Sequence, residues 1–435
     1  MTTERDRSGR LVIGGVPVTA LVEEYGTPLY IYDEATLRER ADAYRRAFAR
    51  HYPRARVVYA GKAYMATWLL PLLESAGLWL DVVSGGELYL AHRGGFPAER
   101  IVFHGNNKTP DELALALQLG IGEVVVDNHH ELDLLERMVP ADGPGLDVLL
   151  RVNPGIDAHT HAYRKTGIVD SKFGLLIESG DAARAVERIV GIPGLRLRGY
   201  HAHIGSQIVE LEPFAATVDA LFRFAAAMRD RFGVVPDQIS PGGGFGIPYE
   251  SGDPEAAIDA YAEAVARSAL AAAERWGFAP PVLTVEPGRS IVGPAGVAVY
   301  RVGTIKDIPG VRRYVCVDGG MADNIRPALY GARYTAALAN RTGEGEALVT
   351  IAGKYCESGD VLIKDIALPT LEPGDLIALP AAGAYCLAMA SNYNLALRPA
   401  VVAVAGGEAR LVQRRERYED LLAREALLAT PPRSD

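Results

Sequence analysis

Eight short apolar or β-branched runs alternate with longer amphipathic segments between about residues 55 and 290 of this 435-residue chain. The runs cover residues 56–60, 78–83, 101–104, 123–127, 146–153, 195–203, 238–240 and 282–286. Strands that alternate with helices form right-handed βαβ units and a parallel sheet. Eight units over roughly 235 residues match a closed (β/α)8 barrel of the TIM type, which takes about 250 residues. A doubly wound open sheet is the alternative that this pattern leaves open.

The segments between the runs show helical periodicity. Between residues 214 and 232 the apolar positions Phe214, Val218, Leu221 and Ala225 recur at helical spacing, and Arg223 lies off that stripe. We expect this segment to be a helix, together with residues 66–76, 86–93, 110–119, 130–138, 180–189 and 254–276.

After residue 286 the sequence pattern changes to short strand-like runs that are separated by turn residues such as Gly, Pro and Asp. The runs cover residues 297–306, 313–318, 347–351, 361–368, 376–380 and 400–405. They predict a mainly-β C-terminal domain, a β-sandwich or Greek-key barrel, with which strand-like pieces of residues 11–32 are expected to pair. The predicted boundaries are 34–290 for the barrel, 1–33 with 291–420 for the β domain, and 421–435 for a tail. Residues 414–435 suggest a charged amphipathic helix and a loose end.

Composition narrows the functional class. Forty-five basic and fifty-four acidic residues give a net charge of −9, which argues against a protein that binds duplex nucleic acid. Three cysteines without a C-x-x-C pair predict neither a disulfide framework nor a finger-type zinc site. The charged N-terminus shows no signal peptide, and the longest uncharged stretch, residues 376–397, contains Pro and Asn residues unsuited to a membrane span. These features predict a soluble cytoplasmic protein that binds neither nucleic acid nor membranes.

Polar and glycine residues gather where the predicted barrel strands end, which is where barrel enzymes place their chemistry. Lys62 follows the first strand, where partial desolvation favours the neutral amine that a Schiff base needs, although a surface lysine would look the same. The run Gly242-Gly-Gly-Phe-Gly246 lets backbone N–H groups approach a phosphate, with help expected from the next helix N-terminus; a flexible loop is the alternative.

Three more rim residues are candidates for a binding site. Glu286 ends an apolar strand, so it should pair either with Arg289 or with a protonated pyridine nitrogen. His201 and His203 share a strand face, but no third ligand is evident and we predict no metal site. A lysine, a phosphate cradle, a carboxylate and an imidazole together match the needs of pyridoxal 5′-phosphate.

Specific motifs then make the chain resemble the meso-diaminopimelate decarboxylases, pyridoxal-phosphate enzymes of the alanine racemase-like barrel type. The resemblance spans about residues 27–399. It rests on Tyr59-Ala-Gly-Lys-Ala63, Asp81-Val-Val-Ser-Gly-Gly-Glu87, Arg151-Val-Asn-Pro-Gly155, Ser171-Lys-Phe-Gly174, His203-Ile-Gly-Ser-Gln207, Gly242-Gly-Gly-Phe-Gly246, Glu286-Pro-Gly-Arg289, Arg326-Pro-Ala-Leu-Tyr330, Cys356-Glu-Ser-Gly-Asp360 and Gly383-Ala-Tyr385. Tyr64 departs from the pattern, since relatives often carry Asn there.

The resemblance implies roles for thirteen residues in the decarboxylation of meso-2,6-diaminopimelate at its D-centre to L-lysine and CO2, the last step of lysine biosynthesis. It implies that Lys62 forms the Schiff base and that Cys356, from the partner subunit of an obligate homodimer, donates the proton. The implied cofactor contacts are Lys62, His203, Ser206, Gly243, Gly244, Glu286, Gly288, Arg289 and Tyr385. The implied contacts to this small amino-acid substrate are Arg289, Arg326, Tyr330, Glu357 and Tyr385.

Residue chemistry supports part of this. Arg326 and Tyr330 are four positions apart and would align on a helical turn, an arginine fork suits a carboxylate, and Glu357 suits an ammonium group. Cys356 lies in a glycine-rich turn of the β domain, although most free cysteines are buried. Two alternatives stay open: another activity on the same scaffold, such as a racemase or a decarboxylase of another basic amino acid or carboxynorspermidine, and a non-catalytic binding protein.

Overall fold

A computed structural model describes residues 3–156, 170–250, 252–254 and 257–426 of the chain. It divides into two compact units. The first comprises Met1–Glu34, Gly296–Ala382 and Met389–Asp435, and the second comprises Ala35–Ala295 and Gly383–Ala388.

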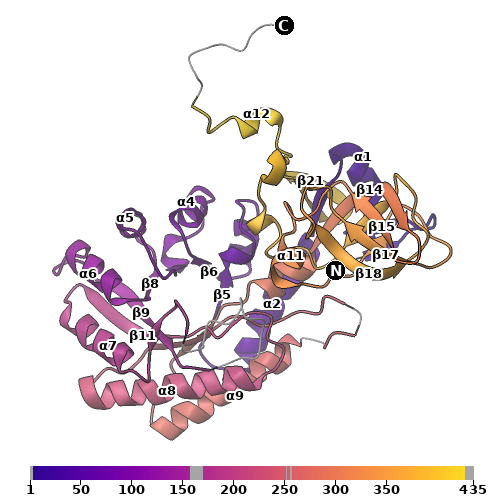
Figure 1. Ribbon diagram of the computed structural model, residues 1–435. Helices are drawn as coiled ribbons and strands as arrows, with labels where there is room; N and C mark the ends of the chain where they lie inside the picture. The colour runs from indigo at the N-terminus through magenta and orange to yellow at the C-terminus, as the bar shows by residue number, and fades with distance from the viewer. Residues whose placement is uncertain (1–2, 157–169, 251, 255–256, 427–435) are drawn as a thin grey trace. The chain divides into compact units, whose positions relative to one another are not determined.

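The second unit is a closed barrel of eight parallel strands (Figure 1). The strands are β5 (Ala55–Ala60), β6 (Trp79–Val82), β7 (Ile101–Phe103), β8 (Glu123–Val126), β9 (Leu146–Asn153), β11 (Leu195–His201), β12 (Gln238–Gly242) and β13 (Val282–Val285). Hydrogen bonds connect β9, β11, β12, β13, β5, β6, β7 and β8 in that order, and β8 pairs with β9 to close the ring. All eight predicted runs form strands, and the closure excludes the open-sheet alternative.

Helices follow the strands and surround them in Figure 1. They are α2 (Glu34–His51), α3 (Leu70–Ser75), α4 (Gly85–Arg93), α5 (Pro110–Leu119), α6 (His129–Met138), α7 (Asp181–Gly191), α8 (Glu212–Phe232), α9 (Ile258–Trp276) and the short α10 (Arg289–Val292). A two-residue strand, β10 (Leu175–Leu176), extends the sheet beside β9. The predicted helices are present within a few residues of their expected ends.

Side-chain caps explain why several helices begin immediately after a strand loop. Ser84 and Asn128 accept hydrogen bonds from the third residues of α4 and α6, and Thr109 forms a reciprocal capping box with Glu112 at the start of α5. Each cap satisfies backbone N–H groups that have no partner inside the helix. The caps therefore fix the loops at the C-terminal ends of β6, β7 and β8, where site residues lie.

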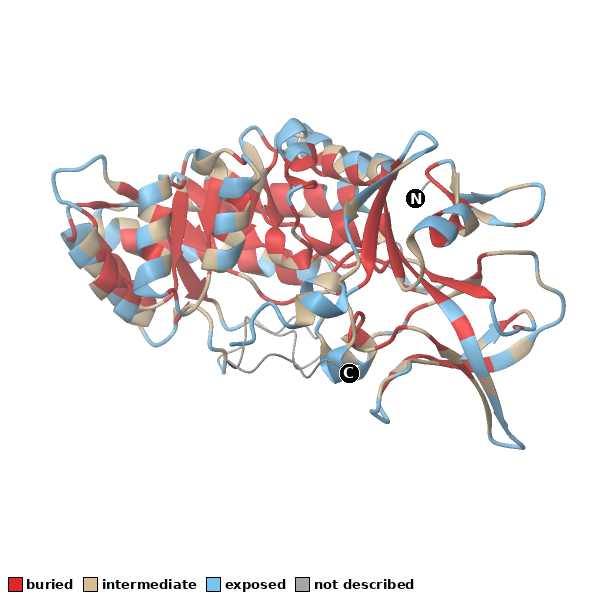
Figure 2. Ribbon diagram, turned by 90° about the horizontal axis from the view of Figure 1, so that it is seen from above, coloured by how far each residue is buried: buried red, intermediate tan, exposed pale blue. Residues whose placement is uncertain are grey.

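The core of the barrel is filled by β-branched and aliphatic side chains. Val58, Val102, Val125 and Leu149, from four different strands, form a buried cluster with Trp79 packed against it. Figure 2 shows buried residues along the strands and exposed residues on the outer sides of the helices. This layer closes the barrel interior, so chemistry is confined to its ends.

The first unit is built on a second nine-stranded sheet. Its strands are β4 (Leu29–Asp33), β14 (Gly296–Ile308), β15 (Arg312–Val317), β16 (Ala337–Leu338), β17 (Ala347–Ala352), β18 (Val361–Leu368), β19 (Leu376–Leu379), β20 (Ala400–Ala405) and β21 (Glu408–Gln413). Its main path runs β18-β17-β15-β14-β4-β20-β21, and β19 joins β14 to β16. The unit also contains α11 (Arg326–Tyr330) and the short α12 (Tyr418–Leu421).

Two sequence expectations need correction here. The N-terminal segment does pair with this sheet through β4, but β1 (Thr3–Arg5), β2 (Leu11–Ile13) and β3 (Val16–Pro17) form a small sheet of their own, followed by α1 (Val18–Tyr25). The helix expected over residues 414–435 is reduced to the four residues of α12, and residues 427–435 lie outside the described chain. Tyr418 and Leu422 remain exposed, so this segment buries no apolar face that would stabilise a longer helix.

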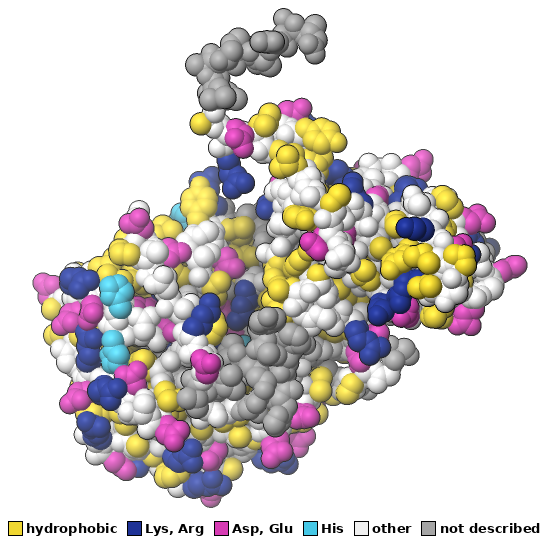
Figure 3. All heavy atoms as spheres, in the orientation of Figure 1, with side chains coloured by type: hydrophobic (Ala, Val, Ile, Leu, Met, Phe, Trp, Pro, Cys, Tyr) yellow, Lys and Arg dark blue, Asp and Glu magenta, His cyan; other side chains and the backbone are white. Residues whose placement is uncertain are grey.

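Charged side chains of both signs are interspersed on the face drawn in Figure 3. This distribution agrees with the small net negative charge of the chain. Across the described residues, no helix combines the length and apolar character needed to cross a membrane.

Candidate active site

Lys62 lies just beyond the C-terminal end of β5, in a single 3-10 turn formed by Gly61–Ala63. The residue is half-buried. Its positive charge acts on Asp81 of β6, whose pKa burial raises to about 8 while Lys62 opposes the rise. The lysine therefore stands at the barrel rim beside a buried carboxyl group.

His203 follows β11 at the same rim, and its Nδ1 accepts a hydrogen bond of 3.2 Å from the backbone N–H of Gly243. Burial and then the positive charges of Lys62 and Arg151 hold the pKa of His203 well below its usual range. The imidazole is therefore neutral at physiological pH, and a flat neutral ring suits stacking rather than ion pairing.

The glycine loop after β12 is tightly enclosed by neighbouring backbone. A Cβ on Gly243 would lie 2.0 Å from the carbonyl oxygen of Glu286, and one on Gly244 would lie 2.2 Å from that of Gly205. Gly244 also has a φ of +103°, which side-chain-bearing residues rarely adopt. The next described helix, α9, begins at Ile258, and the help expected from its N-terminus stays a prediction.

Arg289 supplies the positive charge at this loop. Its guanidinium is buried and donates to Ser206 Oγ at 2.8 Å and to Tyr249 Oη at 2.6 Å, and it lies 4.7 Å from the ring centroid of Tyr385. Its Nε has no hydrogen-bond partner among the described residues. Gly288 precedes it, where a Cβ would lie 2.9 Å from Ala63 Cβ. These groups form a cationic cluster at the loop; the family resemblance implied Ser206, Gly288 and Tyr385 beside Arg289, but not Tyr249.

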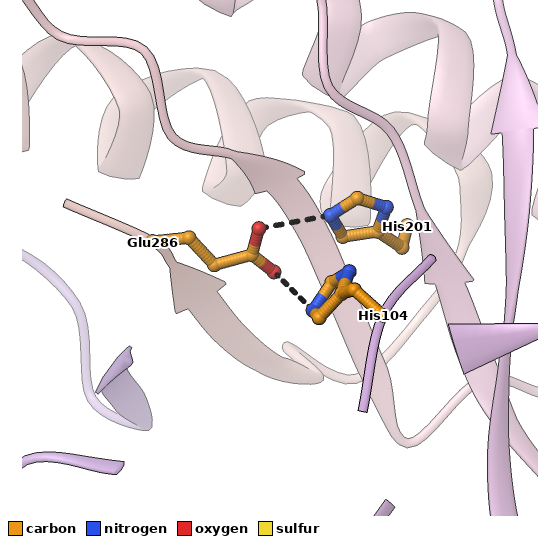
Figure 4. Close-up of side chains that lie close together, drawn as sticks. All are labelled: His104, His201 and Glu286. Atoms are coloured by element: carbon orange, nitrogen blue, oxygen red, sulfur yellow. Dashed lines mark hydrogen bonds and ion pairs between the residues drawn. The ribbon is translucent and has the colours of Figure 1, made fainter. Parts of the chain in front are cut away.

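Glu286 is buried directly after β13 and does not pair with Arg289. Its Oε2 lies 3.0 Å from His201 Nε2 (Figure 4). Its Oε1 accepts from Ser240 Oγ at 3.1 Å. His104 Nε2 lies 3.7 Å from Oε1. Burial would raise the pKa of Glu286, but His201, through its charge and its hydrogen bond, leads the effects that oppose burial, and that pKa lies well below its usual range. The carboxylate is therefore ionised.

Sequence reasoning missed His104 in this cluster. The side chains of His104, His201 and Glu286 place one ligand atom each within 4.8 Å of one another, so a third candidate ligand exists beside His201, on a strand remote in sequence. His203 instead faces the glycine loop. A histidine directly after a strand end was the only signal that could have found His104.

The remaining predicted residues belong to the first unit. Arg326 and Tyr330 are the first and last residues of α11, so the helical turn expected from their spacing is present. Arg326 is buried and donates to Tyr334 Oη. Cys356 and Glu357 are exposed on the turn between β17 and β18, so the common fate of a buried cysteine does not apply.

Asp360 fixes the turn that carries Cys356. Its buried carboxylate accepts from the backbone N–H of Tyr355 at 2.9 Å and from that of Met321 at 2.7 Å. A Cβ on Gly353 would lie 2.1 Å from this carboxylate, which explains the glycine there. The turn of Cys356 is thus connected to the segment that leads into α11.

Tyr64, the departure from the family pattern, is buried next to Trp68. Its hydroxyl accepts from Trp68 Nε1 at 3.2 Å, and Tyr59 Oη donates to its backbone carbonyl at 2.7 Å. The tyrosine at position 64 is therefore accommodated by local packing and hydrogen bonds next to the turn that carries Lys62.

The barrel residues fit pyridoxal 5′-phosphate. The loop glycines leave no room for a Cβ, so an anion can approach the backbone closely, and the buried Arg289 retains a Nε without a hydrogen-bond partner among the described residues. An ionised buried carboxylate suits a protonated ring nitrogen, and a rim lysine suits an aldehyde. The fold and this constellation define a barrel-type enzyme that depends on pyridoxal phosphate.

Comparisons with known proteins specify the family. Residues 34–293 match the model described as "Pyridoxal-dependent decarboxylase, pyridoxal binding domain". Diaminopimelate decarboxylase of Bacillus subtilis is 50% identical over 97% of this chain and 96% of its own, and that of Staphylococcus aureus is 42% identical over 97% and 99%. The crystal structure of the M. jannaschii diaminopimelate decarboxylase, 34% identical, superposes with a TM-score of 0.92 over 98% of both chains. The chain belongs to the diaminopimelate decarboxylase family.

Proposed function

We propose that this chain decarboxylates meso-2,6-diaminopimelate at its D-centre, releasing L-lysine and CO2 in the last step of lysine biosynthesis. The observation that carries the proposal is the barrel rim, where Lys62, the glycine loop with Arg289, and the ionised Glu286 meet in one unit. A relative from M. jannaschii has been crystallised with L-lysine, which supports the product.

The barrel residues would hold the cofactor. Lys62 would bind its aldehyde, His203 would pack on its ring, and the ionised Glu286 would accept a hydrogen bond from its protonated ring nitrogen. The phosphate contacts would be Ser206, Gly243, Gly244, Gly288, Arg289 and Tyr385. Bound pyridoxal phosphate supplies an electron sink for the electron pair that CO2 leaves behind.

The substrate contacts we propose are Arg289, Arg326, Tyr330, Glu357 and Tyr385. An arginine fork binds a carboxylate in two places, and a glutamate binds an ammonium group, so Arg326 and Glu357 suit the distal L-centre. Holding that end fixes which centre reaches the reacting carbon, and the D-centre is the one that loses CO2.

Cys356 of the partner subunit would donate the proton to the α-carbon, in a homodimer whose active sites lie at the interface. The exposure of Cys356 on its turn supports a thiol that serves another chain. We also propose a cytoplasmic location, in agreement with three cysteines that are all free thiols.

Mixing two inactive variants tests the shared site. Lys62→Ala should lose covalent cofactor and Cys356→Ala should retain it, and both should lose turnover. In an equal mixture that exchanges subunits, half of the dimers are hybrids with one intact site, so about a quarter of the activity should return. If the mixture stays inactive although subunits exchange, the thiol does not come from the partner subunit.

Substrate identity is tested by incubation with meso-, LL- and DD-diaminopimelate, ornithine and arginine, following CO2 and the amine product. Only the meso isomer should give L-lysine rapidly. Faster turnover of ornithine or arginine would favour a different decarboxylase on this scaffold, and α-proton exchange without CO2 would favour a racemase.

A further inference from the structure

Each oxygen of the Glu286 carboxylate has its own hydrogen-bond donor within the protein. His201 Nε2 lies 3.0 Å from one oxygen, and Ser240 Oγ donates to the other at 3.1 Å. Figure 4 shows the His201 ring in line with Oε2 and the His104 ring on the side of Oε1. A carboxylate only accepts hydrogen bonds, so Nε2 of His201 is the donor.

Strand register sets this arrangement. His201 is the last residue of β11, lies opposite Ser240 of β12, and Glu286 follows β13, so three neighbouring parallel strands deliver the three side chains. His201 is only 1% exposed, and its other nitrogen has no hydrogen-bond partner among the described residues. The imidazole therefore has one strong contact, and that contact is Glu286.

His104 differs from His201 although both rings face the same carboxylate. Its Nε2 is 3.7 Å from Glu286 and 3.9 Å from Asp81, too far for a hydrogen bond, and its ring packs edge-on against His201 at 4.9 Å between centroids. Burial holds the pKa of His104 well below its usual range, so this ring is neutral. His104 therefore packs against His201 and limits the positions that the His201 ring can adopt.

We propose that His201 is a positioning residue, whose Nε2–H fixes the orientation and the ionised state of the Glu286 carboxylate toward the cofactor ring nitrogen. The inference rests on the role of Glu286 in the proposed function. A buried carboxylate without a donor would gain a proton or rotate, and either change weakens its interaction with a protonated ring nitrogen. The hydrogen bond to His201 opposes both changes.

The test compares His201→Leu, which removes the donor at similar volume, with His201→Gln, whose amide N–H can replace it. We expect kcat of His201→Leu to fall roughly 10- to 100-fold, the range for one hydrogen bond to a charged group. KM for the substrate should change less than about 3-fold, because the substrate contacts are intact. His201→Gln should recover most of kcat.

Two readouts do not depend on turnover. Titration of the apoenzyme with pyridoxal phosphate should show weaker binding and a shifted absorbance band for His201→Leu, with both restored in His201→Gln. His104→Leu is the matched control, and it should change affinity and absorbance less because its ring makes no hydrogen bond to Glu286. Equal defects in the Gln and Leu variants, or a wild-type affinity in the Leu variant, would overturn the proposal.

Glu286→Gln separates this inference from the proposed function. If Glu286→Gln loses activity, adding His201→Leu to it should cost less than about 2-fold further, since the two act through one contact. A full additional loss would show that His201 acts elsewhere. If Glu286→Gln behaves as wild type, the proposed role of Glu286 fails and this inference fails with it.

The same three side chains could bind a divalent metal. Treatment of the holoenzyme with EDTA, or addition of Zn²⁺, should leave activity and cofactor affinity unchanged, because Glu286 is committed to the cofactor. Activity that disappears with the chelator and returns with Zn²⁺ would make the cluster a metal site and overturn the positioning role.

Discussion

The two ends of the barrel both carry buried polar clusters, but they differ in how completely those clusters are hydrogen-bonded. At the N-terminal ends of the strands, Arg56 donates to Glu123 at 2.6 Å and to Gln238 at 2.9 Å, and Gln238 donates to Glu123 at 3.1 Å. The Arg56 guanidinium also lies 3.7 Å from the ring centroid of Trp79. Each polar group of this cluster finds its partner within the cluster.

At the C-terminal ends the pattern is the opposite. Among the described residues, Asp81 Oδ1, His104 Nε2, His201 Nδ1 and Arg289 Nε are buried without a hydrogen-bond partner. Buried polar atoms usually have partners because leaving one unpaired costs about 1–3 kcal/mol. The closed network thus serves stability, and the open one holds polar groups available for a ligand, at the end where barrel enzymes bind theirs.

The largest effect should follow from filling the glycine cradle. Gly243→Ala places a methyl group 2.0 Å from the Glu286 carbonyl oxygen, so the loop and Glu286 must separate. We expect cofactor affinity and kcat/KM to fall on the order of 100-fold, because a shift of about 1 Å in a catalytic constellation has that cost. Titration of the apoenzyme with pyridoxal phosphate and steady-state kinetics measure both.

Gly191→Ala is the matched control for this substitution. Gly191 ends α7, and a Cβ there meets no atom within 4 Å. Activity should be unchanged, with stability equal or higher by up to about 1 kcal/mol. Wild-type affinity in Gly243→Ala would show that the loop can relax, and that its close packing is not what shapes the cofactor site.

The next effect is on stability, at the opposite end. Glu123→Gln leaves Arg56 without its carboxylate in a cluster where Glu123 is 5% exposed. Breaking a buried pair costs about 3–5 kcal/mol, and the partial exposure of Arg56 should reduce this to about 2–3 kcal/mol. Urea unfolding measures the loss, and kcat per folded molecule should stay the same.

Asp259→Asn provides a comparison at the surface. Its partner Arg50 lies 2.8 Å away, and both side chains are more than half exposed, so the loss of stability should stay below about 1 kcal/mol. If Glu123→Gln lowers kcat as strongly as Gly243→Ala, the division between a stabilising end and a functional end is wrong.

Local patterns in the sequence predicted most of the barrel and its rim. The alternation of runs and amphipathic segments predicted the eight strands. The positions of Lys62, Glu286 and the glycine loop after their strands predicted that all three lie at the C-terminal end of the barrel. These are local signals, because a parallel strand places the residue that follows it at a known edge.

Contacts between strands remote in sequence could not be predicted in this way. His104 follows β7 and Glu286 follows β13, which are separated by β5 and β6 around the ring, so their approach depends on barrel closure and strand tilt. One of the two partners predicted for Glu286, Arg289, was wrong, again because the contact depends on the three-dimensional course of the chain. Arg289 is the first residue of α10, and the turn directs it to Ser206 and Tyr249.

The last expected effect is a pH dependence of stability that arises at the C-terminal end of the barrel. Burial, followed by the charges of Glu286 and Glu87 against that of Lys62, raises the pKa of Asp81 to about 8, compared with about 3.9 in an unfolded chain. Between these values the folded apoprotein holds a proton that the unfolded chain has lost, so the free energy of unfolding falls as pH rises from about 4 to about 8. Asp81→Asn cannot titrate, and its stability relative to wild type should therefore increase by at least about 1 kcal/mol across that range, since one unit of pKa is worth about 1.4 kcal/mol. Urea unfolding of the two apoproteins at pH 5 and pH 8 measures the difference. A constant difference would show that Asp81 is ionised in the folded state, and that the open end already neutralises its charge without a ligand.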